Sequence, residues 1–213
     1  MAEIRLNFDL NFQAGIWYGK QLMLSNYVAN ANVLTNTKKP VDNETAVERM
    51  RWFVQNVFHC SVFIEDDDQA QADKLWAAGI NVLQMPGPPT DQMINLLLFT
   101  KLNAIAEGRV ILTDLQLTGN LSDGIRYSCD MEDFFGPFTE KGWWNDPSIT
   151  WYDKALHSKT DGQVTMPPLM TWIGAELGWS EDSAKRSRKK KSNVVNFNKF
   201  KNKDEKIIYI GKA

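Results

Sequence analysis

The sequence predicts an α/β fold whose sheet is mostly parallel. Apolar, β-rich runs alternate with helix-like segments between residues 60 and 118. Turn residues separate these segments, among them Gly79, Gly108 and the Pro-Gly-Pro-Pro stretch 86–89. Alternating strands and helices favour parallel strands joined by right-handed crossovers. We therefore expect a β-α-β-α-β core over residues 60–118, with flanking helices.

Local signals place each element of this core. The run 60–64 is apolar and stops at four consecutive acids, and Gly79 and Gly108 each end a helical pattern. Thr90 is a suitable N-cap for the longer helix. In chain order, the expected elements are strand 60–64, helix 69–78, strand 80–85, helix 90–107 and strand 109–117.

The segments that flank the core are less regular. Apolar and polar residues alternate strictly over residues 3–11, which predicts a half-buried strand. Residues 16–34 carry a short helical stripe, and the asparagine-rich stretch 26–36 is typical of a loop. A helix with one apolar face is expected from about Asp42, and an edge strand over 125–129 after a hairpin turn.

Length and composition divide the chain into three parts. With 213 residues, the chain is long enough for one core and an appendage. We expect an α/β domain over residues 1–130, an irregular tryptophan-rich arm packed on it over 131–180, and a flexible basic tail over 181–213. Two cysteines and the absence of a run of about 18 apolar residues indicate an intracellular protein that does not enter a membrane.

Charge is distributed unevenly along the chain. Residues 185–213 hold eleven lysines and arginines against two acids, a net charge of +9. Residues 1–184 hold 13 basic and 24 acidic groups, a net charge of −11. A dense basic block can neutralise phosphates, so we expect the tail to contact nucleic acid or an acidic protein. The candidate nucleic-acid-binding residues are Lys185, Arg186, Arg188, Lys189, Lys190 and Lys191. The alternatives are a solubilising tail or one that folds back on the acidic body.

Aromatic residues mark a second class of candidate contacts. Trp143 and Trp144 lie in the turn-rich arm, and Phe197, Phe200 and Tyr209 lie in short apolar segments of the tail. Tryptophan and tyrosine concentrate at protein interfaces, so these residues are candidates for partner binding. The alternative is that the rings of the arm pack on the body and that the tail segments join the protein's own sheet. A homo-oligomer is also possible, because the apolar arc of helix 90–107 is broad.

The acidic stretch that follows the first core strand is the candidate for chemistry. Glu65, Asp66, Asp67 and Asp68 stand at the carboxyl end of a strand, and Asp114 lies in the third core strand. Together, these carboxylates suit Mg²⁺ and phosphate-ester hydrolysis. Solvated loop acids and helix caps are the ordinary alternative. No other cofactor is expected, because a glycine-rich phosphate loop and a nucleophilic triad are both absent from the sequence.

One resemblance bears on the setting of the protein. The segments Glu107-Gly108-Arg109, 135–138 and 142–147, followed by a basic C-terminal tail, resemble uncharacterised proteins of tailed bacteriophages. The resemblance implies a virus-encoded protein in a host cytoplasm or virion, and it carries no catalytic residue. Our leading hypothesis is a non-enzymatic binding or assembly protein. The alternatives are a metal-dependent phosphoesterase or nuclease and an acidic inhibitor that mimics DNA.

Overall fold

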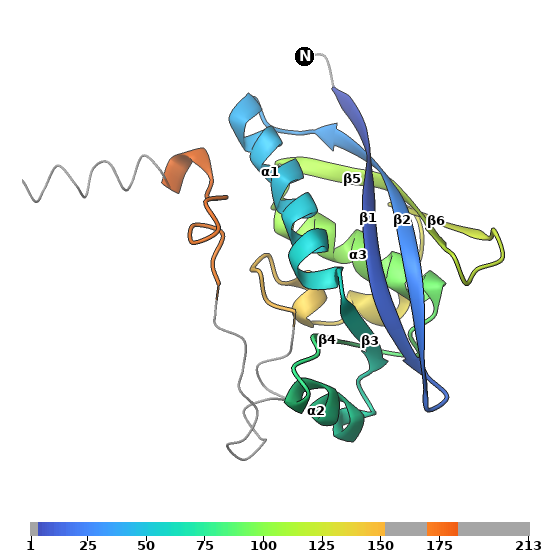
Figure 1. Cartoon of the computed structure of the whole chain (residues 1–213). Helices are drawn as coiled ribbons and strands as arrows, with labels where there is room; N and C mark the ends of the chain where they lie inside the picture. Colours follow the sequence, from blue (N-terminus) through green and yellow to red (C-terminus); the bar gives the residue numbers. More distant parts are fainter. Residues whose placement is uncertain (1–3, 152–169, 183–213) are drawn as a thin grey trace, which may run out of the picture. The chain divides into compact units, whose positions relative to one another are not determined.

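A computed structural model describes residues 4–151 and 170–182. The described chain forms one six-stranded sheet in the order β4-β3-β1-β2-β5-β6 (Figure 1). The strands are β1 Arg5–Tyr18, β2 Gln21–Thr35, β3 Ser61–Glu65, β4 Val82–Met85, β5 Val110–Gly119 and β6 Arg126–Asp130. The helices are α1 Pro40–Phe53, its π-helical continuation η1 Val54–Phe58, α2 Gln69–Ala77, α3 Asp91–Ala106 and the short 3₁₀ turns η2 Gly136–Thr139 and η3 Trp143–Asn145.

The prediction of a mostly parallel sheet is wrong. All five elements expected between residues 60 and 118 are present, as β3, α2, β4, α3 and β5. However, only β1–β3 and β3–β4 pair in parallel, whereas β1–β2, β2–β5 and β5–β6 are antiparallel. The long β1–β2 hairpin lies between β3 and β5, so the third core strand never meets the other two.

The misread strand is β2. From residue 25 onward, its inward side chains are buried and alternate with residues that face the other side of the sheet, three of which are asparagines (Asn26, Asn30 and Asn32). The inward set is Ser25, Tyr27, Ala29, Ala31 and Val33. Two of these are alanines, which carry little hydrophobic signal, and asparagine favours turns, so the period of two is hard to recognise in the sequence. The expected helix over 16–34 and the loop over 26–36 are therefore wrong: residues 16–18 end β1, residues 19 and 20 form the turn, and residues 21–35 are the 15-residue strand β2.

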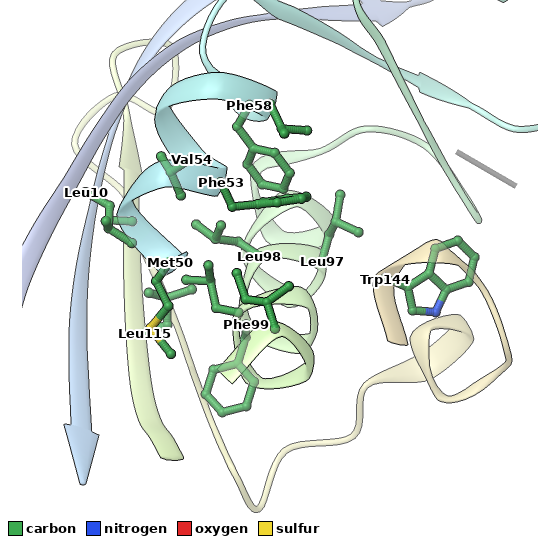
Figure 2. Packing of buried hydrophobic residues seen from close by; sticks show 14 of the residues in the cluster. Leu10, Met50, Phe53, Val54, Phe58, Leu97, Leu98, Phe99, Leu115 and Trp144 are labelled. Carbon is green, nitrogen blue, oxygen red and sulfur yellow. The ribbon is translucent and has the colours of Figure 1, made fainter. Parts of the chain in front are cut away.

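Two helices cover one face of the sheet. α1 and α3 lie against the same side of β1, β2 and β5 (Figure 1). Side chains from these elements interlock there, including Leu10 of β1, Met50 and Phe53 of α1, Leu98 of α3 and Leu115 of β5 (Figure 2). Burial of this apolar surface, at about 25 cal/mol per Å², is the main source of stability.

The opposite face of the sheet is largely polar. α2 covers only its β3–β4 end, where Leu75 packs with Val62, Ile64 and Val82. Across β1, β2 and β5, side-chain amides and carboxylates form a hydrogen-bonded ladder. Its bonds run from Asn7 to Asn32, from Asn30 to Asp9 and from Asn32 to Asp114, each 2.8 Å long. An antiparallel sheet with one solvated face is the common arrangement for such alternation.

The described residues through Trp179 group into one compact unit, which does not include residues 180–182. Within this unit, η2, η3 and the segment around Trp172 pack on the body beside α3 and α1. None of the described helices is long and apolar enough to cross a membrane.

Candidate functional site

The acidic loop after β3 is held by hydrogen bonds from neighbouring groups. The Asp68 carboxylate accepts a hydrogen bond from the Trp17 indole at 3.1 Å, and the Asp66 amide donates to the carbonyl of Met85. Asp66 and Asp67 are exposed. Partial burial, and then the charge of Asp67, raise the pKa of the Asp66 carboxyl. The loop therefore links β3, β4 and α2 and exposes two acids to solvent.

Asp114 does not join this loop. It lies on β5, and the strands β1 and β2 separate β5 from β3. At about 4.8 Å between neighbouring strands, this distance is roughly 14 Å. The predicted set of Glu65, Asp66, Asp68 and Asp114 therefore cannot hold one Mg²⁺ ion. Among residues 4–151 and 170–182, no three His, Cys, Asp or Glu side chains are grouped so that they could bind a metal.

Asp114 belongs instead to the polar face of the sheet. Its carboxylate accepts hydrogen bonds from the Asn32 amide at 2.8 Å and from the Ser128 hydroxyl at 3.1 Å. A β-bulge at Asn32/Val33 breaks the register beside it, and Thr113 is the extra residue on β5. A cavity of about 360 Å³ lies at this bulge and is lined by Arg5, Leu6, Asn32, Val33, Leu34, Thr113 and Asp114. The two adjacent polar residues Thr113 and Asp114, which interrupt the alternation of β5, were the available sequence signal.

Trp143 and Trp144 lie inside the protein. They are 4% and 8% exposed. The Trp143 indole donates to the carbonyl of Gln84 at 2.7 Å, and the Trp144 indole donates to the carbonyls of Phe138 and Glu140. The rings therefore fix the arm to the β4 edge and to α3, which is the packing alternative, and little of either ring is left for a partner.

A buried lysine organises the same arm. Lys101 of α3 is fully buried, and its ammonium donates to four main-chain carbonyls, those of Trp143, Asp146, Ser148 and Thr150, at 2.7–3.0 Å. Burial lowers the pKa of Lys101 to about 7, although the nearby Asp146 opposes this effect. The pattern of α3 gave no sign of this role, because a lone lysine in a helix is ordinarily exposed.

A second buried cation holds the segment that ends at Trp179. Arg49 of α1 is 2% exposed. It donates to the carbonyl of Leu177 at 2.8 Å and pairs with the Glu107 carboxylate at 2.8 Å. Trp179 stacks on its guanidinium and donates to the same carboxylate at 3.0 Å. Both buried cations are therefore used in folding, and neither is available to bind a polyanion.

The basic tail lies outside the described residues. This applies to Lys185, Arg186, Arg188, Lys189, Lys190 and Lys191 and to the aromatic candidates Phe197, Phe200 and Tyr209. Their proposed contacts stay predictions from the sequence.

No family model and no curated protein matches the chain. Among solved structures, an uncharacterized protein, WS1659 from Wolinella succinogenes, is similar with a TM-score of 0.47 and 11% identity, over 62% of this chain and 100% of that one. A catalytic-residue mutant of Plasmodium vivax 6-pyruvoyltetrahydropterin synthase has a TM-score of 0.40 and 11% identity, over 61% and 98%. A second structure of that enzyme gives 0.37 and 12%, over 60% and 96%. These likenesses are too weak to transfer an activity.

Proposed function

We propose that this chain is a non-enzymatic binding protein that contacts nucleic acid through its basic tail. The observation that carries the proposal is the division of charge, −11 over residues 1–184 and +9 over residues 185–213. A tail of this kind neutralises phosphates and releases their counterions, which supplies binding energy without base-specific contacts.

The described body supports this division of roles. Arg49 and Lys101, its two buried cations, are hydrogen-bonded to main-chain carbonyls, and Arg49 is also paired with Glu107. They add no positive charge to the surface. Exposed acids such as Asp66, Asp67 and Asp130 would repel a phosphate backbone. The body is therefore better suited to hold a protein partner or a second copy than to bind nucleic acid itself.

The test is fluorescence anisotropy of the full chain with labelled single-stranded and double-stranded DNA and RNA at several salt concentrations. We expect the affinity to fall steeply as salt rises, with a slope of about 0.9 per neutralised phosphate on duplex DNA. Replacing Lys189, Lys190 and Lys191 together by glutamine should weaken binding and lower the slope by about one per lysine.

The matched control has the same loss of charge on the body. Lys20, Lys38 and Lys141 are exposed there, and replacing all three by glutamine should leave binding near that of the wild type. If the two triple variants bind equally well, or if binding does not depend on salt, the proposal is wrong. Binding to polyglutamate in place of every nucleic acid would make the partner an acidic protein.

A further inference from the structure

The two edges of the sheet differ in how they are covered. At β4, the indole of Trp143 donates to the carbonyl of Gln84, so the arm caps this edge. At the other edge, β6 pairs with β5, and no other strand of the described chain adjoins it. An unpaired edge presents main-chain donors and acceptors to any strand that can align with it.

The hydrogen bonds of Asp130 show which groups of β6 point outward. Its amide donates to the Asp133 carboxylate at 2.8 Å, so the main chain of Asp130 faces away from β5. Main-chain direction alternates along an antiparallel strand. The main-chain groups of Ser128 and Arg126 therefore face the same open side.

Residues at equal distances before and after Ser128 in the sequence have complementary or similar side chains. Arg126 precedes it by two positions and Asp130 follows by two, whereas Ile125 and Met131 stand three positions away on either side. Arg126, Ser128 and Asp130 are exposed, and Ile125 and Met131 are 54% and 58% exposed. We propose that β6 pairs antiparallel with β6 of a second copy of this chain, with the two-fold axis at Ser128.

This register places opposite charges face to face. Each Arg126 stands opposite Asp130 of the second copy at the two ends of the paired strands. Within one chain, Arg126 and Asp130 are four strand residues apart, roughly 13 Å, so they cannot pair with each other. In an isologous interface the same residues from both copies meet about a two-fold axis. β6 suits such an interface because Arg126 of each copy would meet Asp130 of the other.

The carboxylates around β6 would attract the arginine of a second copy. Asp114 stands directly opposite Asp130 in the β5–β6 ladder, and Asp133 contacts Asp130. Like charges at directly opposed positions are destabilising. Among the described residues, no lysine or arginine forms an ion pair with these three carboxylates. The guanidinium of Arg126 from a second copy would relieve their repulsion.

The dimer is expected to be weak and reversible. The pairing offers two hydrogen bonds at Ser128. At each end, the Arg126 amide can donate to the Asp130 carbonyl of the second copy only as a second donor, because that carbonyl already accepts from the Asp133 amide at 3.3 Å. The Asp130 amide remains bound to Asp133. Two five-residue strands bury less than the roughly 1,000 Å² of a stable interface. The equilibrium should therefore depend on protein concentration.

Sedimentation velocity of the full chain tests the pairing by charge reversal. The wild type should dimerise as its concentration rises, and Arg126→Asp or Asp130→Arg alone should weaken the dimer at least about tenfold, because like charges then face each other. The double variant carrying both changes should regain the affinity of the wild type. Arg5→Asp makes the same change on exposed β1 and should have no effect. A folded wild type that is monomeric at every concentration, or a double variant no better than the single ones, would overturn the proposal.

Cross-linking separates this contact from association through the tail. Opposed residues of a hydrogen-bonded pair have Cα atoms about 5.5 Å apart, within the 4.4–6.8 Å range of a disulfide. In a Cys60→Ser background, Ser128→Cys should form a linked dimer on mild oxidation. Asn11→Cys, on the exposed face of central β1, should not. Absence of linkage at Ser128→Cys, or an equal yield after Arg126→Asp is added, would contradict the β6 pairing.

Discussion

The guanidinium carbon of Arg49 lies 3.5 Å from the centre of the Trp179 ring. The two residues are 130 positions apart in sequence, and both contact the Glu107 carboxylate. The ring of Trp172 lies 4.8 Å from the same guanidinium. One planar cation therefore joins α1, the end of α3 and the segment that leads to Trp179.

Replacing Arg49 by lysine should destabilise the fold by about 2–4 kcal/mol, because an ammonium can neither stack on Trp179 nor reach the Leu177 carbonyl and Glu107 together. Arg51→Lys is the matched control. Arg51 is two residues away, its side chain is 49% exposed, and its partner Glu48 lies on the same helix, so the change should cost less than about 0.5 kcal/mol. Chemical denaturation measures both. If the two variants lose the same free energy of unfolding, the stacking and hydrogen bonds of the Arg49 guanidinium do not stabilise the fold more than an exposed arginine does.

Lys101→Met should cost on the order of 3–5 kcal/mol, since the four carbonyls of residues 143–150 lose their buried donor. Lys74→Met removes an exposed charge from α2 and should be nearly neutral. The near-ultraviolet circular dichroism of Trp143 and Trp144 should also change in Lys101→Met but not in the control. A stable Lys101→Met protein with an unchanged tryptophan spectrum would contradict the role given to this lysine.

The stability contributed by Lys101 should also depend on pH. Burial lowers its folded pKa to about 7, below the value of about 10.4 for an unfolded lysine. Between these values the unfolded chain binds more protons, so the free energy of unfolding rises with pH across this window and is constant below it. The measurement is the difference in unfolding free energy between wild type and Lys101→Met from pH 6 to 10. If this difference does not change with pH, Lys101 has the same pKa in the folded and unfolded protein, and the four carbonyls compensate fully for its burial.

The sequence predicted individual elements better than the relations between them. α3 has a capping Thr90 and a broad apolar arc, so its existence and ends are local properties, and the structure confirms them. Strand order is not local. Whether β5 pairs with β4 or β2 depends on where the β1–β2 hairpin inserts, and the alanines and asparagines of β2 gave that hairpin little hydrophobic signal.

The candidate site was harder to predict for the same reason. Asp66 follows β3 and Asp114 lies in β5, and these two strands run in the same direction, which suggested that both acids lie at one edge of the sheet. However, β1 and β2 lie between β3 and β5. The roles of Arg49 and Lys101 depend on carbonyls more than 40 residues away in sequence, those of Leu177 and Trp143. A charged residue in a helix gives no sequence signal that distinguishes such burial from ordinary exposure.

Tyr27→Phe should destabilise the protein by about 1–2 kcal/mol. The Tyr27 hydroxyl is buried and donates to the Asp91 carboxylate at 2.8 Å, and Ser122 donates to the same carboxylate. Burial, and then the charge of Asp91, raise the pKa of the Tyr27 phenol well above its ordinary range. Removing the hydroxyl leaves Asp91 short of one donor at the start of α3. Tyr18→Phe, at the 56% exposed Tyr18, should be neutral, and thermal unfolding compares the two.

The two cysteines should react at very different rates. Cys60 is exposed, and although the first core strand was expected to begin with it, its positive φ of 61° places it in the turn before β3. Cys129 is 3% exposed on β6, and burial, together with the charges of Asp133, Asp114 and Asp130, raises the pKa of its thiol to about 12. A thiolate is the reacting species, so Cys129 should be protected both by its pKa and by its burial.

A disulfide reagent that releases a coloured thiolate should therefore titrate one fast thiol in the native protein and two after denaturation. Cys60→Ser should remove the fast phase and leave a slow one, whose rate reports the opening of β6 from the sheet. Because Cys129 and the edge groups of Ser128 are adjacent, conditions that favour β6 pairing should slow this remaining phase further. Fast labelling of Cys129 in native Cys60→Ser protein would show that β6 is not held against β5 and α3 as described.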